Sequence, residues 1–176
     1  MRQVLAFTLT ATLPLALAAC YTTGEPEGGP AFALVGPAGQ SLGQVRMWET
    51  PGGVTFRIGA AGIAHGIHGV HVHAVGRCDG PKFESAGPHW NPAAKKHGFN
   101  NPAGPHAGDL PNVTVPANGV LQEAISLPGA SFAAMLDADG AALVIHARAD
   151  DFVTDPSGNS GDRIACAMIS AAVPSG

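Results

Sequence analysis

The histidines of this sequence are its clearest sign of a functional site. The chain has eight histidines in 176 residues, and two of them form the triplet His71-Val72-His73. Side chains at i and i+2 of a β-strand point to the same face. His71 and His73 would therefore project together, an arrangement suited to a single metal ion, while Val72 would point into a core. A His-x-His pair alone is weak evidence, so its weight depends on the rest of the chain.

A second set of candidate ligands lies in a stretch rich in glycine, proline and asparagine. His89, His97, His106 and Asp109 follow one another at spacings of eight, nine and three residues. Three imidazoles and one carboxylate are a suitable tetrahedral set for zinc, and ligation by nitrogen and oxygen alone argues against an iron–sulfur cluster. Because this stretch has little apolar surface to bury, a bound metal ion would supply the free energy that orders it.

The remaining histidines divide into one candidate ligand and two bystanders. His146 ends the apolar run 142–145 and would join the triplet if its strand lies beside that strand. Asp150 follows and could accept the second N–H of a metal-bound histidine, which fixes the ring. We expect His68 to face away from the site and bond to backbone, and His65, close to Gly62 and Gly66, to be solvated.

Short strands joined by turns and two long loops must position these residues. We predict strands at Ala31–Gly36, Leu42–Glu49, Gly53–Gly59, Ile67–Ala74, Val120–Leu127, Ala142–Ala147 and Ile164–Ser170. Residues 53–59 alternate between apolar and polar side chains, the period of a half-buried strand. The long loops, 75–118 and 148–163, contain or border nearly all candidate ligands. The pattern predicts an all-β sandwich or barrel with antiparallel strands.

Composition excludes one class of partner. Charged residues make up 12% of the chain and the formal charge is −4. No basic cluster is dense enough to bind nucleic acid, so we expect none to be a partner.

The N-terminus predicts export. Residues 1–19 carry a single charge at Arg2, then an apolar run too short for a membrane span, then small residues, which together indicate a signal peptide. The string Leu17-Ala18-Ala19-Cys20 resembles the lipobox of bacterial lipoproteins, in which the cysteine is lipidated. Residues 20–30 would then be a flexible tether, and the anchor at Cys20 the only membrane contact. The alternatives are a retained N-terminal anchor, or cleavage that leaves a chance thiol.

Six motifs occur in a fixed order along the chain. They are Gly69-Val70-His71-Val72-His73, Ser85–Pro92, Lys96-His97-Gly98, His106–Leu110, Val144-Ile145-His146 and Gly161–Cys166. On these motifs the sequence resembles bacterial copper/zinc superoxide dismutases over residues 31–174. The resemblance implies an all-β fold, a flattened eight-stranded antiparallel Greek-key β-barrel with a long zinc/disulfide loop and an electrostatic loop. It also implies dismutation of superoxide to O₂ and H₂O₂, one copper and one zinc ion per chain, and a location in the periplasm or cell envelope.

The resemblance also implies a role for each matching residue. The copper ligands would be His71, His73, His89 and His146. The zinc ligands would be His89, His97, His106 and Asp109, so His89 would bridge the two ions and carry a proton. Asp150 would link a copper-ligand histidine to a zinc-ligand histidine, and His68 would be structural. Arg163 would receive the anion, and Cys78 and Cys166 would form the intrachain disulfide.

Two questions stay open at this point. A copper-binding or copper-buffering protein of the periplasm, without efficient turnover, could share the fold, although the presence of Arg163 and His89 favours the enzyme. The family includes monomers and homodimers, so a homodimer remains open.

Removing Arg2 with the signal peptide makes the mature chain more negative, so an anionic substrate needs a local positive funnel. The cationic residues that we expect at its rim are Arg77, Lys82, Lys95, Lys96 and Arg148.

Overall fold

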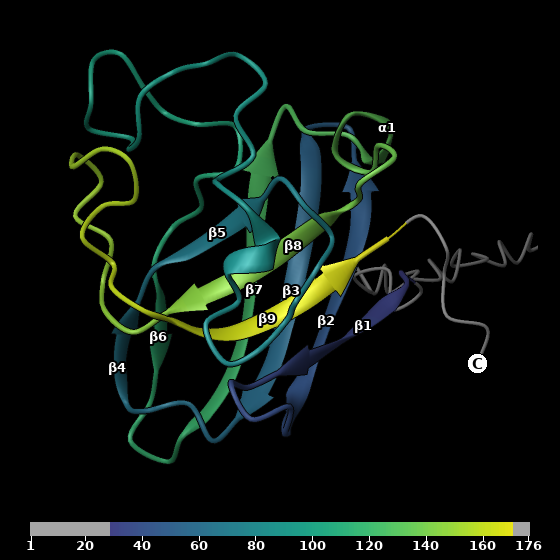
Figure 1. Ribbon diagram of the computed structural model, residues 1–176, viewed down its shortest axis with the longest axis vertical. Coiled ribbons are helices and arrows are strands. Elements are labelled where there is room, and N and C mark those ends of the chain that lie inside the picture. Colours follow the sequence, from purple (N-terminus) through teal and green to yellow (C-terminus); the bar gives the residue numbers. More distant parts are fainter. Residues whose placement is uncertain (1–28, 171–176) are drawn as a thin grey trace, which may run out of the picture.

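The predicted strands form a curled antiparallel sheet (Figure 1). The structure, a computed structural model, describes residues 29–170. The predicted signal peptide, Cys20 and most of the predicted tether lie outside these residues. The elements are β1 (Ala31–Val35), β2 (Ser41–Thr50), β3 (Gly53–Ala61), β4 (Gly66–His68), β5 (Val70–His73), the 3₁₀-helix η1 (Glu84–Ala86), β6 (Val113–Val115), β7 (Val120–Pro128), α1 (Phe132–Met135), β8 (Ala141–His146) and β9 (Arg163–Ile169).

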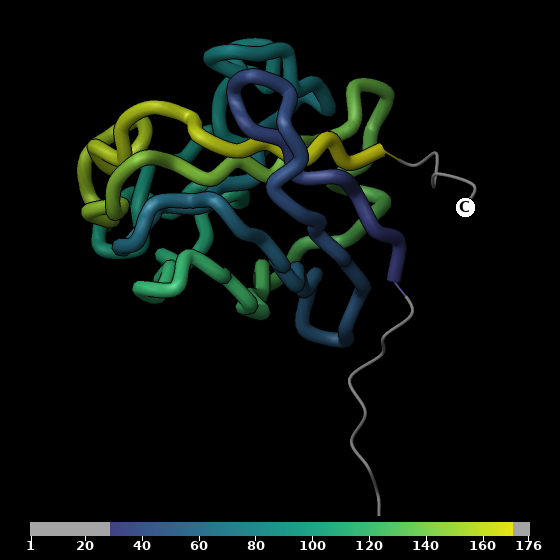
Figure 2. The backbone as a smooth tube through the Cα atoms, turned by 90° about the horizontal axis from the view of Figure 1, so that it is seen from below, coloured from purple at the N-terminus to yellow at the C-terminus, as the bar shows by residue number. Residues whose placement is uncertain are grey.

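Seven strands hydrogen-bond in the order β5-β8-β9-β1-β2-β3-β7, and β4 pairs with β6 in a separate ladder. Every neighbouring pair is antiparallel. Figure 2 shows the curl of the backbone from below. This all-β, almost helix-free architecture confirms the Greek-key barrel class that the sequence predicts.

The predicted strand Ile67–Ala74 is wrong as a single strand, because it breaks at Gly69. Its first half, β4, pairs with β6, whereas its second half, β5, pairs with β8. The Gly69 N–H donates to the Arg148 carbonyl at 2.8 Å, and the Gly69 carbonyl accepts from the His146 N–H at 2.9 Å. A Cβ at Gly69 would lie 3.0 Å from that of Ser160. The break therefore brings the start of one long loop against the strand that carries His71.

Three short elements were not predicted. The strand β6 and the helix η1 lie inside the predicted loop 75–118, and α1 lies between β7 and β8. Elements of three or four residues are too short to show a clear period in the sequence. The other six predicted strands are confirmed, with ends shifted by a few residues. If β4 and β5 are counted as one interrupted strand, residues 29–170 contain the eight strands that were expected.

The strand β8 is buried on both faces. Leu143 and Ile145 belong to the main core between the two sides of the sheet, whereas Ala142 and Val144 pack into a smaller cluster with Phe83 beneath the loop that follows β5. A strand that is covered on both faces has a continuous run of apolar residues, which explains why residues 141–145 are all apolar. Val72 lies in the main core, as predicted, so the histidines on either side of it point to the other face.

Three predictions about the periphery have different outcomes. His68 is a structural histidine as expected: its ring nitrogens lie 2.7 Å from the His146 carbonyl and 2.9 Å from the Ala64 carbonyl. His65 is exposed. Pro30, predicted to be part of the tether, instead belongs to the domain, because its carbonyl accepts from the Met47 N–H at 3.2 Å.

Within residues 29–170 there is no helix with the length and apolar character of a membrane span.

The disulfide predicted between Cys78 and Cys166 is present and closes a sequence separation of 88 residues. We expect Cys78→Ser to lower the free energy of unfolding by roughly 4–5 kcal/mol, because the unfolded chain regains the entropy of an open loop. Denaturant unfolding of the variant and of wild-type protein, each with and without reductant, tests this. Reduced wild-type protein should match the variant, and a variant as stable as oxidised wild-type would contradict the prediction.

Candidate metal centre

Four buried imidazoles converge on one point and leave their inner nitrogens without partners. These atoms are Nδ1 of His71 and Nε2 of His73, His89 and His146, and each of the four residues offers a ring nitrogen within 4.8 Å of those of the others. We call these residues the four-histidine cluster. A buried polar atom without a partner costs about 1–3 kcal/mol, so four that face each other call for a shared cation. Imidazole nitrogen suits copper as well as zinc.

Burial also keeps these rings in the form that binds a metal ion. Desolvation lowers the pKa of His89 to about 4 and the pKa of His146 to about 3. Burial lowers the pKa of His71 and of His73 in the same way. Neutral imidazole is the metal ligand, so the cluster offers four lone pairs at neutral pH.

The outer nitrogens of the cluster are fixed by neighbours. His73 Nδ1 donates to the Gly87 carbonyl at 2.8 Å, and His146 Nδ1 donates to the Gly161 carbonyl at 3.1 Å. His71 Nε2 donates to Asp150 at 2.8 Å. Such bonds set the tautomer and the orientation of each ring, so the inner nitrogens stay aimed at the common point.

A second group of ligand atoms surrounds the other side of His89. Asp109 Oδ1 lies 3.0 Å from Nδ1 of His89 and of His97, and 3.3 Å from Nδ1 of His106. The two Nδ1 atoms of His89 and His106 are 3.3 Å apart. Four ligands about 2.0–2.1 Å from a tetrahedral zinc ion lie roughly 3.3 Å from one another, so these spacings fit zinc. We call this set the carboxylate cluster.

Asp109 is held in place by the loop itself. Its Oδ2 accepts from the backbone N–H of Gly98 at 2.8 Å and of His106 at 3.0 Å. His71 also lies within 4.8 Å of His89, His97 and Asp109, but its Nε2 is bonded to Asp150 and its Nδ1 belongs to the four-histidine cluster. His106 is therefore the fourth member of the carboxylate cluster. Only His89 has one ring nitrogen in each cluster.

Asp150 joins the two clusters from outside, as the sequence predicts. Its Oδ2 accepts from His71 and its Oδ1 from His97 Nε2 at 3.0 Å. Asn112 fixes its backbone through two hydrogen bonds, of 2.8 and 2.9 Å. A Cβ at Gly158 would lie only 1.8 Å from Asp150 Oδ1. Neither Asn112 nor Gly158 was predicted, because no local pattern marks a residue whose role is set by a contact across two loops.

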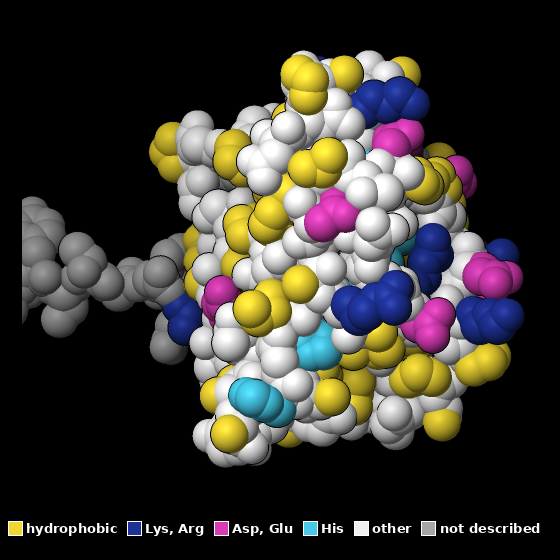
Figure 3. Space-filling model, turned by 90° about the vertical axis from the view of Figure 1, so that its left-hand side faces the viewer, with side chains coloured by type: hydrophobic (Ala, Val, Ile, Leu, Met, Phe, Trp, Pro, Cys, Tyr) yellow, Lys and Arg dark blue, Asp and Glu magenta, His cyan; other side chains and the backbone are white. Residues whose placement is uncertain are grey.

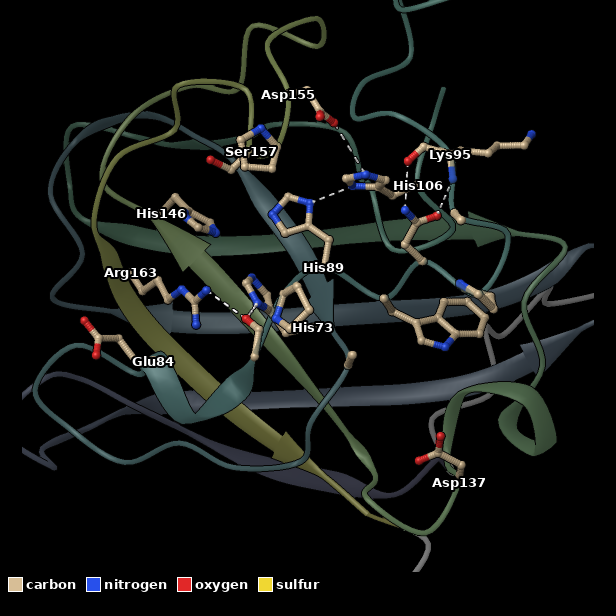
Figure 4. A pocket seen from close by; sticks show the side chains of 18 of the residues that line it. His73, Glu84, His89, Lys95, His106, Asp137, His146, Asp155, Ser157 and Arg163 are labelled. Atoms are coloured by element: carbon tan, nitrogen blue, oxygen red, sulfur yellow. Dashed lines mark hydrogen bonds and ion pairs between the residues drawn. The ribbon is translucent and has the colours of Figure 1, made fainter. Parts of the chain in front are cut away.

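Arg163 lies at the wall of an open pocket of about 960 Å³ that His73, His89, His106 and His146 also line (Figure 4). A register shift between Ile145 and His146 pairs His146 with Arg163 across β8 and β9. The guanidinium donates to the carbonyls of Phe83 at 2.6 Å and of Gly87 at 2.8 Å. Its position beside the four-histidine cluster is the one expected of an anion-binding arginine.

The positive rim that the sequence predicts is largely neutralised. Among the predicted rim residues, Arg77 pairs with Asp79, Lys82 lies 4.0 Å from Glu84, and Lys96 Nζ lies 3.0 Å from Asp155. Arg148 donates to the Asn159 carbonyl, which leaves its charge in place, but Arg148 does not line the pocket. Lys95 lines the pocket, but so do three carboxylates, Glu84, Asp137 and Asp155. Figure 3 shows basic and acidic side chains side by side on this face. Of the five residues expected at the rim, only Lys95 therefore lines the pocket.

Comparison with known proteins gives one consistent family. The family described as copper/zinc superoxide dismutase (SODC) matches residues 41–169. The superoxide dismutase-like protein YojM of Bacillus subtilis is 43% identical over 143 residues, which cover 77% of this chain and 73% of that protein. The superoxide dismutase [Cu-Zn] 1 of Aquifex aeolicus is 38% identical over 142 residues, which cover 77% of this chain and 84% of that protein.

Solved structures agree with these sequence matches. A crystal structure of a SOD-like protein from Bacillus subtilis, at 42% identity, has a TM-score of 0.77 and covers 80% of this chain and 99% of its own. The Cu/Zn superoxide dismutase from Brucella abortus, at 27% identity, has a TM-score of 0.70 and covers 81% of this chain and all of its own.

Proposed function

This chain belongs to the copper/zinc superoxide dismutase family, and we propose that it dismutates superoxide to O₂ and H₂O₂. In this proposal the four-histidine cluster holds copper, the carboxylate cluster holds zinc, and His89 is shared between them. The observation that supports it most strongly is the set of four unpaired, buried imidazole nitrogens beside Arg163. The accessible pocket beside these nitrogens admits a small anion.

When bound, copper supplies the one-electron redox cycling that zinc cannot supply. The residues of the chain supply position and protons. His89 Nε2 faces the four-histidine cluster and Nδ1 faces Asp109, so Nε2 could hold a proton whenever it does not bind an ion, while Nδ1 stays fixed by the carboxylate cluster. That proton would be available to the reduced product, since H₂O₂ formation consumes protons.

Arg163 orients the substrate in this proposal. Two of its five N–H donors are used by backbone carbonyls, and the others remain for an anion in the pocket. A guanidinium fixed in this way offers a planar fork rather than a mobile point charge.

The first test measures metal content and superoxide decay together. We expect one copper and one zinc ion per chain and decay far faster than in buffer. Arg163→Ala should retain both metals and lose roughly 10- to 100-fold in rate, because the focused attraction for the anion is removed. Arg46→Ala, on β2 and outside the pocket, serves as the matched control and should keep the wild-type rate.

Two results would contradict the proposal. Zinc alone, with no activity after copper loading, would overturn it outright. Full copper and zinc content without accelerated decay would instead favour the second candidate, a copper-binding or copper-buffering protein. That candidate is kept because one relative is named only superoxide dismutase-like.

Glu84 gives a second prediction, because it lines the pocket and acts on Arg163. Burial lowers the pKa of the Arg163 guanidinium, and the charge of Glu84 opposes that shift. We expect wild-type activity to fall as salt is added. Glu84→Gln should raise the rate roughly twofold at low ionic strength and steepen its salt dependence, since focused fields govern encounter with a charged substrate. Glu123→Gln on β7 is the control. An unchanged or lower rate for Glu84→Gln would contradict this view.

We also propose that the protein protects the cell envelope, anchored to a membrane by lipid at Cys20. The support is the sequence alone: Cys20 directly follows the predicted signal peptide 1–19 in the string Leu17-Ala18-Ala19-Cys20. Two acyl chains contribute about 0.8 kcal/mol per buried methylene, enough for durable anchoring. Labelled palmitate should enter the wild-type protein in a lipidating host but not Cys20→Ala. Equal labelling of both, or of neither, would contradict the anchor.

A further inference from the structure

We propose that Asp155 is a positioning residue for the zinc ion, a second outer carboxylate that acts alongside Asp150. This inference rests on the zinc site of the proposed function. It concerns a residue whose type and position carry no signal in the sequence, because it lies in a turn of the second long loop, between Thr154 and Pro156.

Asp155 contacts the carboxylate cluster in two places. Its Oδ1 accepts from the backbone N–H of His97 at 2.8 Å, and the same oxygen lies 3.8 Å from His106 Nε2. Figure 4 shows Asp155 above the ring of His106. One carboxylate of the second long loop therefore reaches two of the three histidines of the zinc loop.

The remaining nitrogens of the cluster show why this position matters. His97 Nε2 is bonded to Asp150, and His89 Nε2 faces the four-histidine cluster. His106 Nε2 lies 3.8 Å from Asp155 Oδ1, an ion-pair distance that is longer than a hydrogen bond. Metal-bound histidines commonly direct the second N–H to a carboxylate, which orients the ring and makes it a better ligand. Asp155 lies on that side of His106, and its direct hold on the zinc loop is the hydrogen bond from the His97 N–H.

Asp155 is itself firmly placed and charged. Asp151 caps the turn before it, accepting from the backbone N–H of Val153 at 2.9 Å and of Thr154 at 2.8 Å. Its Oδ1 accepts the His97 N–H, and its Oδ2 lies 3.0 Å from Lys96 Nζ. An aspartate with these partners offers a fixed negative charge to a cationic metal site.

The alternative is that Asp155 is one half of a surface ion pair with Lys96 and nothing more. The Lys96 side chain is 61% exposed, and such pairs contribute little to stability. This alternative predicts that loss of either partner has the same small effect. The positioning role predicts that only loss of Asp155 affects zinc.

The experiment titrates zinc into the metal-free full chain against a chromophoric chelator. We expect Asp155→Ala to weaken zinc binding roughly 10- to 100-fold, the usual effect of losing an outer carboxylate. Asp155→Asn should lower zinc affinity less, because its carbonyl oxygen can still accept the hydrogen bond from the His97 N–H. Lys96→Met should keep a zinc affinity close to that of the wild-type protein. Cobalt placed in the zinc site should change its visible spectrum in both Asp155 variants and not in Lys96→Met, while copper affinity should change little.

The proposal fails if zinc affinity is unchanged in both Asp155 variants, or if Lys96→Met lowers zinc affinity as much as Asp155→Ala does. It also fails if Asp155→Ala lowers copper affinity as much as zinc affinity, which would indicate that the whole site has loosened. Thermal unfolding of the metal-free proteins shows whether Asp155→Ala folds. If Asp155→Ala does not fold, the zinc affinity of Asp155→Asn decides the test. Wild-type protein that binds no zinc would remove the zinc site of the proposed function and this role with it. A tight wild-type site that is insensitive to Asp155 overturns only this inference.

Discussion

Six imidazoles are withdrawn from water at one end of the sheet, and the surrounding structure compensates for that burial. His71, His73 and His97 have no exposed surface, and His89, His106 and His146 have 7% or less. An imidazole has two nitrogens that must both be satisfied when it is buried. With the ions of the proposed function, His71, His73, His97 and His146 each give one nitrogen to an ion and direct the other to a fixed oxygen. His89 divides its two nitrogens between the clusters.

The two clusters obtain their rigidity from different sources. His71 and His73 stand on β5, whose intervening Val72 is anchored in the main core, and His146 ends a strand that is buried on both faces. The carboxylate cluster has no such support, because His97 and His106 lie in a loop without regular structure. Its order comes from polar contacts: Asp109 within the loop, and Asp150 and Asp155 from the facing loop. A metal ion completes that order rather than creating it alone.

The sequence predicted the residues that meet in the two clusters better than the residues that hold them in place. The shared face of the two histidines on β5 follows from strand periodicity, and the other members follow from spacing and from the resemblance to a family. Other features depend on strand register and on contacts between loops, which no local sequence pattern encodes. They are the break at Gly69, the register shift before His146, and the contacts that Asn112 and Gly158 make with Asp150. The rim prediction went wrong for a related reason. A list of lysines and arginines says nothing about the carboxylates that pack against them, such as Asp155 beside Lys96.

The same pairing explains why Arg163 keeps a role that the rim residues lose. Asp155 holds the zinc loop, and in doing so it cancels the charge of Lys96, so order in the loop reduces the positive field at the pocket. Arg163 is held by the carbonyls of Phe83 and Gly87 instead of by a carboxylate. Carbonyl dipoles fix a guanidinium through hydrogen bonds without neutralising its net charge. In a chain with 13 acidic and 9 basic residues, these two hydrogen bonds keep Arg163 rigid beside the four-histidine cluster, where Glu84 is the carboxylate whose charge still acts on it.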